Sequence, residues 1–487
     1  MKISTAFRSK NFRWRVFGIV FALVLFFFAV QVYVEHRIEV SIADKLPEHV
    51  LLDYADLDVN LFLGNLSFQD ANLLLLHKDS KKTKAKIETK AFEINGLDYV
   101  TLWNKKSFLS EKVLLKNGKL SVFKKYSDSL EFSVSNIALE LDSFQTDALQ
   151  LKKKIPFNYG VIKLSLNDLF LNLSQFEILK IKKLTLDKEA LRADVLSIVS
   201  KFSKTELSKK LSAERDHVNL NVSNMTGIAA GLEVVNDSLQ IHAEELKLED
   251  VELLLYRDKT LADDTSTKRM YGGLLRKLPI RLNVDSVLIE NGRVSYAEKV
   301  GHTIKPSSIL FDKLNASILN LSNINLGTTK LKATANLMGV APIELKSSFQ
   351  SRNAGTVFQA SVVLKDLETT AINPFMESNA NVRVDGHVNE LYLTVNGNEM
   401  KSSGDMKMKY ENFKFSVLDK DRLGINKTLT AIVNIFTNDG SKTDEKGYRY
   451  GKIEVERDHT KSFFNYLWLN AKDGLKNTVV GNGKKED

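Results

Sequence analysis

A short pattern of apolar residues recurs along the chain, and each copy breaks the alternation of a β-strand at the same point. Two alternating apolar positions precede an Asp or Asn, and beyond one variable residue the alternation resumes with the opposite parity. A straight strand would turn the second half of each copy toward the other face of the sheet. A bulge or corner at the Asp or Asn keeps the apolar residues on one face. The pattern therefore predicts bent strands with one apolar face.

Five copies are recognised, at residues 66–75, 113–122, 164–173, 246–255 and 287–296. One gap is about twice the others, so a degenerate copy is expected within it. The predicted bend formers are Asn117, Gly118, Asn291 and Gly292, because Asn and Gly tolerate positive φ. Asp70, Asp168 and Asp250 are expected to cap their bends through the carboxylates. Hairpins of an ordinary β protein that share turn chemistry are the alternative interpretation.

Period-two alternation dominates from about residue 40 to residue 457, with Lys, Glu, Asn and Ser on the polar side. This is typical of antiparallel sheets with one face in water. We therefore expect a mostly β fold in which an elongated, curled antiparallel sheet carries few helices. Alternation alone does not separate an open trough from a closed sandwich, because both bury one face of every strand.

Three segments depart from this alternation. Apolar residues at helical spacing predict an internal helix over residues 187–213. Residues 262–277 contain an acidic pair and a glycine pair and are interpreted as a linker or loop. Thr460 to Lys476 predicts an amphipathic, aromatic-rich helix that covers the last strand, with a membrane-surface helix as the alternative.

The N-terminus predicts a membrane anchor. Residues 16–34 are uncharged and long enough to span a bilayer as a helix, and no cleavage site is recognisable. Five basic residues precede this span, so residues 1–15 are expected to stay cytoplasmic. The body would be translocated, which in a bacterium with two membranes means the periplasm. The expected domains are a β region at 35–261 with one helical insertion, the linker 262–277, a β region at 278–457, and the helix and tail at 458–487.

The composition favours a binding function over catalysis. The 487 residues contain no Cys, which excludes disulfides, thiolate metal sites and cysteine nucleophiles. The usual catalytic and phosphate-binding motifs are missing, and the eight His residues are scattered. We therefore expect no catalytic residue, no metal and no cofactor. Five of the nine net positive charges lie in the first fifteen residues, so the rest of the chain is nearly balanced. We expect no nucleic acid as a partner, because the body is expected to be translocated.

Several strings in the second half of the chain resemble the AsmA-like family of Gram-negative envelope proteins. LPIRLNVDSVLIENGRVSYAEK at 278–299 and FDKLNASILNLSN at 311–323 are similar to the middle of that family. The stretches at 366–398 and 402–418 and the ending RDHTKSFFNYLWLNAKDGLK at 457–476 resemble its C-terminal region. The similarity covers roughly residues 278–476, whereas residues 40–260 match only in pattern.

The resemblance implies a repeating β-groove whose concave apolar face binds or conducts phospholipid, anchored in the inner membrane and supporting outer-membrane lipid balance. Partner proteins at either membrane are also implied. An assembly or scaffold factor that binds proteins by strand addition is the alternative. The residues expected to line the groove are Leu66, Phe68, Leu115, Leu120, Leu164, Leu166, Leu171, Leu248, Leu253, Ile289 and Val294.

Overall fold

The computed structural model describes His36 and most of the chain beyond it. The described ranges are 47–105, 107–150, 153, 157–235, 238–278, 280–301, 305–325, 327–350, 357–419 and 443–480. The expected segments 1–15 and 16–34, and the last seven residues of the tail, lie outside them. No helix in the described ranges is long and apolar enough to cross a membrane. As expected, the fold is mostly β.

The chain forms two compact units. The N-terminal unit comprises residues 1–171 and 185–188, and the C-terminal unit comprises residues 172–184 and 189–487. This boundary passes through two strands, β7 (Ile162–Asn172) and β8 (Glu177–Asp187). The segment 262–277, which was expected to separate two β regions, lies within the C-terminal unit.

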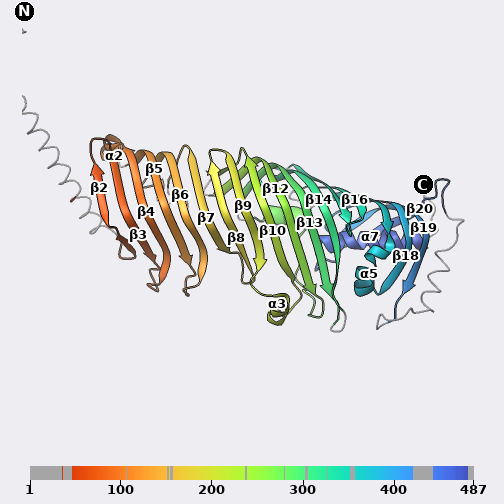
Figure 1. The fold of residues 1–487 in the computed structure, drawn as a ribbon. Helices are drawn as coiled ribbons and strands as arrows, with labels where there is room; N and C mark the ends of the chain where they lie inside the picture. Colours follow the sequence, from red (N-terminus) through yellow and green to blue (C-terminus); the bar gives the residue numbers. More distant parts are fainter. Residues whose placement is uncertain are drawn as a thin grey trace, which may run out of the picture. The chain divides into compact units, whose positions relative to one another are not determined.

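The N-terminal unit is built from long antiparallel strands, drawn in red to light orange in Figure 1. Two short strands, β1 (Val50–Asp53) and β2 (Asp56–Asn60), both pair with β3 (Asn65–Leu76). The order then continues through β4 (Thr83–Leu97), β5 (Ser107–Phe123), β6 (Leu130–Asp147) and β7. One short helix, α2 (Tyr99–Lys105), connects β4 to β5.

The C-terminal unit contains a second succession of paired strands. They are β9 (Ala190–Ser200), β10 (Asp216–Ile228), β11 (Gly231–Val235), β12 (Ser238–Asp258), β13 (Arg281–Lys299), β14 (Ser307–Ser322), β15 (Thr328–Leu337), β16 (Ala341–Gln350), β17 (Phe358–Glu368), β18 (Val382–Gly397), β19 (Lys401–Val417) and β20 (Arg449–Glu456). Its helices are α3 (Lys204–Lys210), α4 (Tyr271–Arg276), η3 (Thr369–Ile372), α5 (Asn373–Ala380) and α7 (Phe463–Val480). Among the described residues no pairing returns from β20 to β9, so this sheet is open.

One pair in this unit is parallel. β12 runs parallel to β13, whereas the other described pairs of both units are antiparallel. A parallel pair needs a crossover connection, and residues 259–280 supply it. The expected linker 262–277 is therefore part of a packed crossover that contains α4, and its Met270 is only 1% exposed.

The predicted bends are present. All five Asp and Asn residues of the pattern have positive φ, between 46° and 53°. The Asn residues carry the bends, because Gly118 and Gly292 are not among the residues with positive φ. A Cβ on Gly118 would lie 2.1 Å from Leu115 Cδ2, so this glycine provides space beside the bulge. The three Asp residues also adopt positive φ, so they form the bends with their own backbone. Their carboxylates can in addition bind a neighbouring strand, and Asp250 Oδ1 accepts a hydrogen bond from Asn291 Nδ2 at 2.5 Å.

The repeating unit is a single bulged strand. Asn136 on β6, Val195 on β9 and Lys313 on β14 have φ between 48° and 51° at the position that Asp or Asn holds in the five recognised copies. The copy at Val195 lies in the long gap, where a degenerate copy was expected. Adjacent bulges meet across strands, since Asp250 and Asn291 both follow the paired residues Glu249 and Glu290 of β12 and β13 and their side chains are hydrogen-bonded.

The helix expected over residues 187–213 was a wrong prediction. Residues 190–200 form β9, and the helix is limited to α3, which has a capping box between Ser203 and Glu206. Leu191, Val195 and Ile198 lie at helical spacing because the apolar residue Val195 occupies the bulge, where the parity of β9 changes. When only one sequence is considered, the apolar spacing of a bulged strand therefore resembles that of a helix.

Replacing a bulge Asn with a β-branched residue should destabilise the C-terminal unit. Asn291 has φ 53°, a conformation that is strained for Val. We expect Asn291→Val to lower the free energy of unfolding by about 1–3 kcal/mol, from backbone strain and the lost bond to Asp250. Asn291→Gly should cost less, because Gly accepts positive φ. Urea unfolding followed by circular dichroism measures both, and equal losses would contradict a backbone cause.

Candidate functional site

The bulged strands give the N-terminal unit one continuous apolar face. Residues directly opposite each other on paired strands point to the same face. One row across β3 to β7 is Phe68, Phe92, Leu115, Leu139 and Leu164, and another across β3 to β6 is Leu73, Ile87, Leu120 and Val134. We call this surface the N-terminal apolar face. The strand pairings place six of the predicted lining residues on this face: Leu66, Phe68, Leu115, Leu120, Leu164 and Leu171. Leu166 lies on the same face because it is two residues from Leu164 in β7.

The opposite face of the same strands is polar. Lys112 Nζ lies 2.7 Å from Glu140 Oε1, and Lys116 Nζ lies 2.6 Å from Glu93 Oε1. The hydrogen bond from Lys112 lowers the pKa of Glu140 below its usual value. Such exposed pairs contribute little stability, but they identify the side of the sheet that faces water.

The N-terminal apolar face is only partly filled. Aromatic side chains pack at one end of the strands, where Phe108, Phe144 and Phe157 follow one another at centroid distances of 5.9 and 5.2 Å. Farther along the strands, Leu73, Ile87 and Leu120 are half-buried. The described helix of this unit, α2, packs against β5, so these aliphatic side chains are left without a described second layer.

The C-terminal unit has an apolar face of the same construction. One row crosses β9 to β15 through Ile198, Leu220, Leu253, Val294, Phe311 and Leu337. A second row contains Ala193, Met225, Leu248, Ile289 and Ala316. We call this surface the C-terminal apolar face. The predicted lining residues Leu248, Leu253, Ile289 and Val294 all lie on it.

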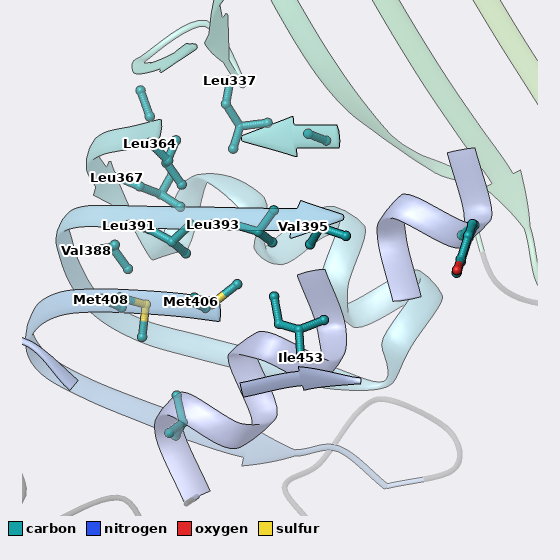
Figure 2. Packing of buried hydrophobic residues seen from close by; sticks show 14 of the residues in the cluster. Leu337, Leu364, Leu367, Val388, Leu391, Leu393, Val395, Met406, Met408 and Ile453 are labelled. Carbon is teal, nitrogen blue, oxygen red and sulfur yellow. The ribbon is translucent and has the colours of Figure 1, made fainter. Parts of the chain in front are cut away.

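The helix α7 covers this face over the last strands, as predicted from its amphipathic sequence. Figure 2 shows part of the core, where Leu393, Met406 and Ile453 lie close to one another. The close approach of α7 to β19 and β20 depends on two glycines. A Cβ on Gly451 would lie 2.4 Å from Thr478 N, and a Cβ on Gly474 would lie 2.8 Å from Met406 Cε. Arg449 Nε donates to the carbonyl of Thr478 at 2.9 Å, and it binds the C-terminal end of the helix.

A charged cluster fixes the crossover and the start of the last helical segment. The carboxylate of Glu214, with its side chain 3% exposed, lies 3.1 Å from both Lys259 Nζ and Lys461 Nζ. Lys461 also lies 3.1 Å from Asp263 on the crossover. Desolvation opposes the charge of Lys461, but its hydrogen bonds to Glu214 and Asp263 raise its pKa above the usual value. This cluster has a structural role, because its charges are paired with one another.

Side chains of α7 also form hydrogen bonds with backbone groups on the outer edge of β20. The amide of Glu454 donates to Asp473 Oδ2 at 3.0 Å, and Asn477 Nδ2 donates to the carbonyl of Lys452 at 2.8 Å. These groups would otherwise be available to pair with an added strand. The last strand is therefore protected against β-augmentation at the centre of its edge.

Removing this protection should cause self-association. We expect the double variant Asp473→Ala, Asn477→Ala to form dimers through paired β20 edges, because it exposes one donor and one acceptor. Sedimentation velocity of the full chain in detergent would show the larger species, and Asp458→Ala serves as a control away from the edge. A monomer in both variants would mean that the edge is blocked by other means.

Two features of the site were missed from the sequence. The additional bulged strands β6 and β14 extend the apolar faces, and the crossover places Met270 against the core under α7. The copy on β6 satisfies the pattern in full, with Phe132, Val134, Asn136, Ile137 and Leu139, and could have been found. Among the described residues, no group of three His, Asp or Glu side chains is placed to hold a metal ion.

A scan against protein-family models finds no match, and a search of curated proteins finds none either.

Proposed function

We propose that this protein binds phospholipid through its two apolar faces, is anchored in the inner membrane by residues 16–34, and belongs to the AsmA-like family. The observation that carries this proposal is the continuous row of half-buried aliphatic side chains without a described second layer, as at Leu73, Ile87 and Leu120. Apolar surface of this kind marks a binding site when it is extended and rimmed by polar residues.

Acyl chains fit this surface chemically. Transfer of each CH₂ from water to an apolar environment contributes about 0.8 kcal/mol, so a chain of ordinary length has ample driving force to bind. The headgroup would stay at the strand ends, where lysines such as Lys82 and Lys84 are exposed. Binding and transfer of this kind need no catalytic residue.

The alternative function, protein binding by strand addition, is less well supported. Asp473 and Asn477 already bind the backbone N–H of Glu454 and the carbonyl of Lys452 on the edge of β20. Few backbone groups at the centre of that edge are therefore available to pair with a partner strand. A protein partner at another surface would be compatible with the lipid proposal.

Mass spectrometry of co-purified lipid tests the proposal. The full chain would carry a protease site inserted between residues 36 and 46, so that the body is released from the anchor and its annular lipids. We expect phospholipid in stoichiometric amounts with the released body. A correctly folded body without phospholipid, but with a stoichiometric protein partner, would favour the assembly-factor alternative.

A further inference from the structure

Two neighbouring surface segments of the N-terminal unit expose apolar side chains together. On the turn between β2 and β3, Leu63 is 57% exposed. On α2, Tyr99, Val100 and Leu102 are 40%, 70% and 38% exposed. We call these four residues the corner patch. Single exposed apolar residues are common on proteins, but three on one seven-residue helix beside a fourth on a turn form a concentrated feature.

The two segments are held side by side. The amide of Leu97, two residues before α2, donates to the carbonyl of Gly64 at 2.9 Å. A Cβ on Gly64 would lie 2.7 Å from Leu97 N, so the turn packs closely against the end of β4 that leads into α2. The orientation of α2 is fixed at its start, where Asp98 accepts from Thr101 N at 3.0 Å and from Thr101 Oγ1 at 2.6 Å. The patch is therefore built into the fold.

We propose that the corner patch inserts into the headgroup region of the membrane that holds the anchor. This inference rests on the anchor in the proposed function. Fifteen residues separate the end of the apolar segment at residue 34 from the start of β1 at Val50, which limits their separation to about 50 Å. The first strands therefore stay near the bilayer, and the tether gives the patch a high effective concentration at that surface.

The chemistry of the patch fits a lipid interface better than a protein partner. Tyr, Val and Leu side chains are suited to the boundary between headgroups and acyl chains, and the exposed Lys105 at the end of α2 suits anionic phosphates. No acidic residue occurs between residues 99 and 105 or between 61 and 64. At the other end of β5, the turn at residues 124–129 is rich in charged and polar residues.

Fluorescence quenching by spin-labelled lipid tests the proposal. The chain contains no Cys, so single replacements Leu63→Cys and Val100→Cys can each carry an environment-sensitive fluorophore. The control is Tyr126→Cys, which is 72% exposed at the opposite end of β5. The full chain is reconstituted into vesicles of phosphatidylethanolamine and phosphatidylglycerol that contain a lipid with a nitroxide near its headgroup. We expect at least twofold stronger quenching at residues 63 and 100 than at residue 126.

Three results would overturn the inference. Equal quenching at the three positions would show that the patch does not insert. Contact quenching or crosslinking between two labelled chains, without quenching by lipid, would assign the patch to a second copy. If the protein does not float with the vesicles, the chain has no membrane anchor, and the proposed membrane location is wrong. Quenching as expected in a protein whose released body carries no lipid would support the patch while contradicting the proposed function.

Discussion

The double variant Leu120→Lys, Leu253→Lys should purify with about tenfold less phospholipid than the unaltered protein. Leu120 lies on the N-terminal apolar face and Leu253 on the C-terminal apolar face, so each unit receives one charge where acyl chains are proposed to bind. An ammonium group held against an acyl chain loses hydration, and a cost of only about 1.4 kcal/mol already gives a tenfold loss of binding. Lipid phosphorus per mole of released body measures the effect.

The neighbouring residues provide a matched control. Ser121 and Leu254 follow the substituted residues directly, and the alternation of the strands places them on the opposite face. The variant Ser121→Lys, Leu254→Lys adds the same charges to the same strands and should retain its lipid. Circular dichroism would establish equal folding of the two variants. Equal lipid loss in both would mean that the faces are not the binding surface.

The substitution Phe358→Ala should produce the largest loss of stability in the C-terminal unit. Phe358 is 1% exposed and contacts two aromatic residues of the C-terminal segment, with centroid distances of 4.9 Å to Phe463 and 5.7 Å to Tyr466. Truncation of a buried Phe costs about 3–5 kcal/mol through lost transfer free energy and the cavity that remains. We also expect the docking of α7 to weaken first, because these contacts join it to β17.

Tryptophan fluorescence provides the measurement. The chain has three Trp residues, and Trp468 on α7 contacts Phe375. In a background with the other two Trp replaced by Phe, Trp468 reports urea unfolding of this region. Val357→Ala, one residue away and 52% exposed, should shift the midpoint little. A small shift for Phe358→Ala would show that α7 is not held by this core.

The apolar parity of the strands could be read from the sequence because it depends on local rules. A strand alternates with period two, and a reversal of parity requires a bulge, which is how Asn117 and Asn291 were identified. Val195 and Lys313 adopt the same backbone conformation without a residue type that favours it. At those positions the pairing of neighbouring strands imposes the bulge, and a single sequence does not display tertiary pairing.

Other features depend on contacts between distant residues. Parallel and antiparallel neighbours have the same alternation, so the parallel pairing of β12 with β13 leaves no local signal. The acidic and glycine pairs in residues 262–277 indicate a loop, but the burial of Met270 follows from its packing near Phe358 and Phe463. The amphipathic character of α7 was visible in the sequence, whereas the roles of Gly451 and Gly474 required the structure.

A photo-crosslinking scan along β5 tests the central claim most directly. A photoreactive amino acid would replace each residue from 112 to 123 in turn, and crosslinks to phospholipid would be detected through labelled phosphate in living cells. We predict strong crosslinking at Leu115, then at Leu120 and Val122, because the bulge at Asn117 changes the parity while the face stays the same. Val113 should crosslink weakly, because aromatic side chains cover it. Uniform crosslinking, or none at Leu115, Leu120 and Val122, would contradict a lipid-binding apolar face.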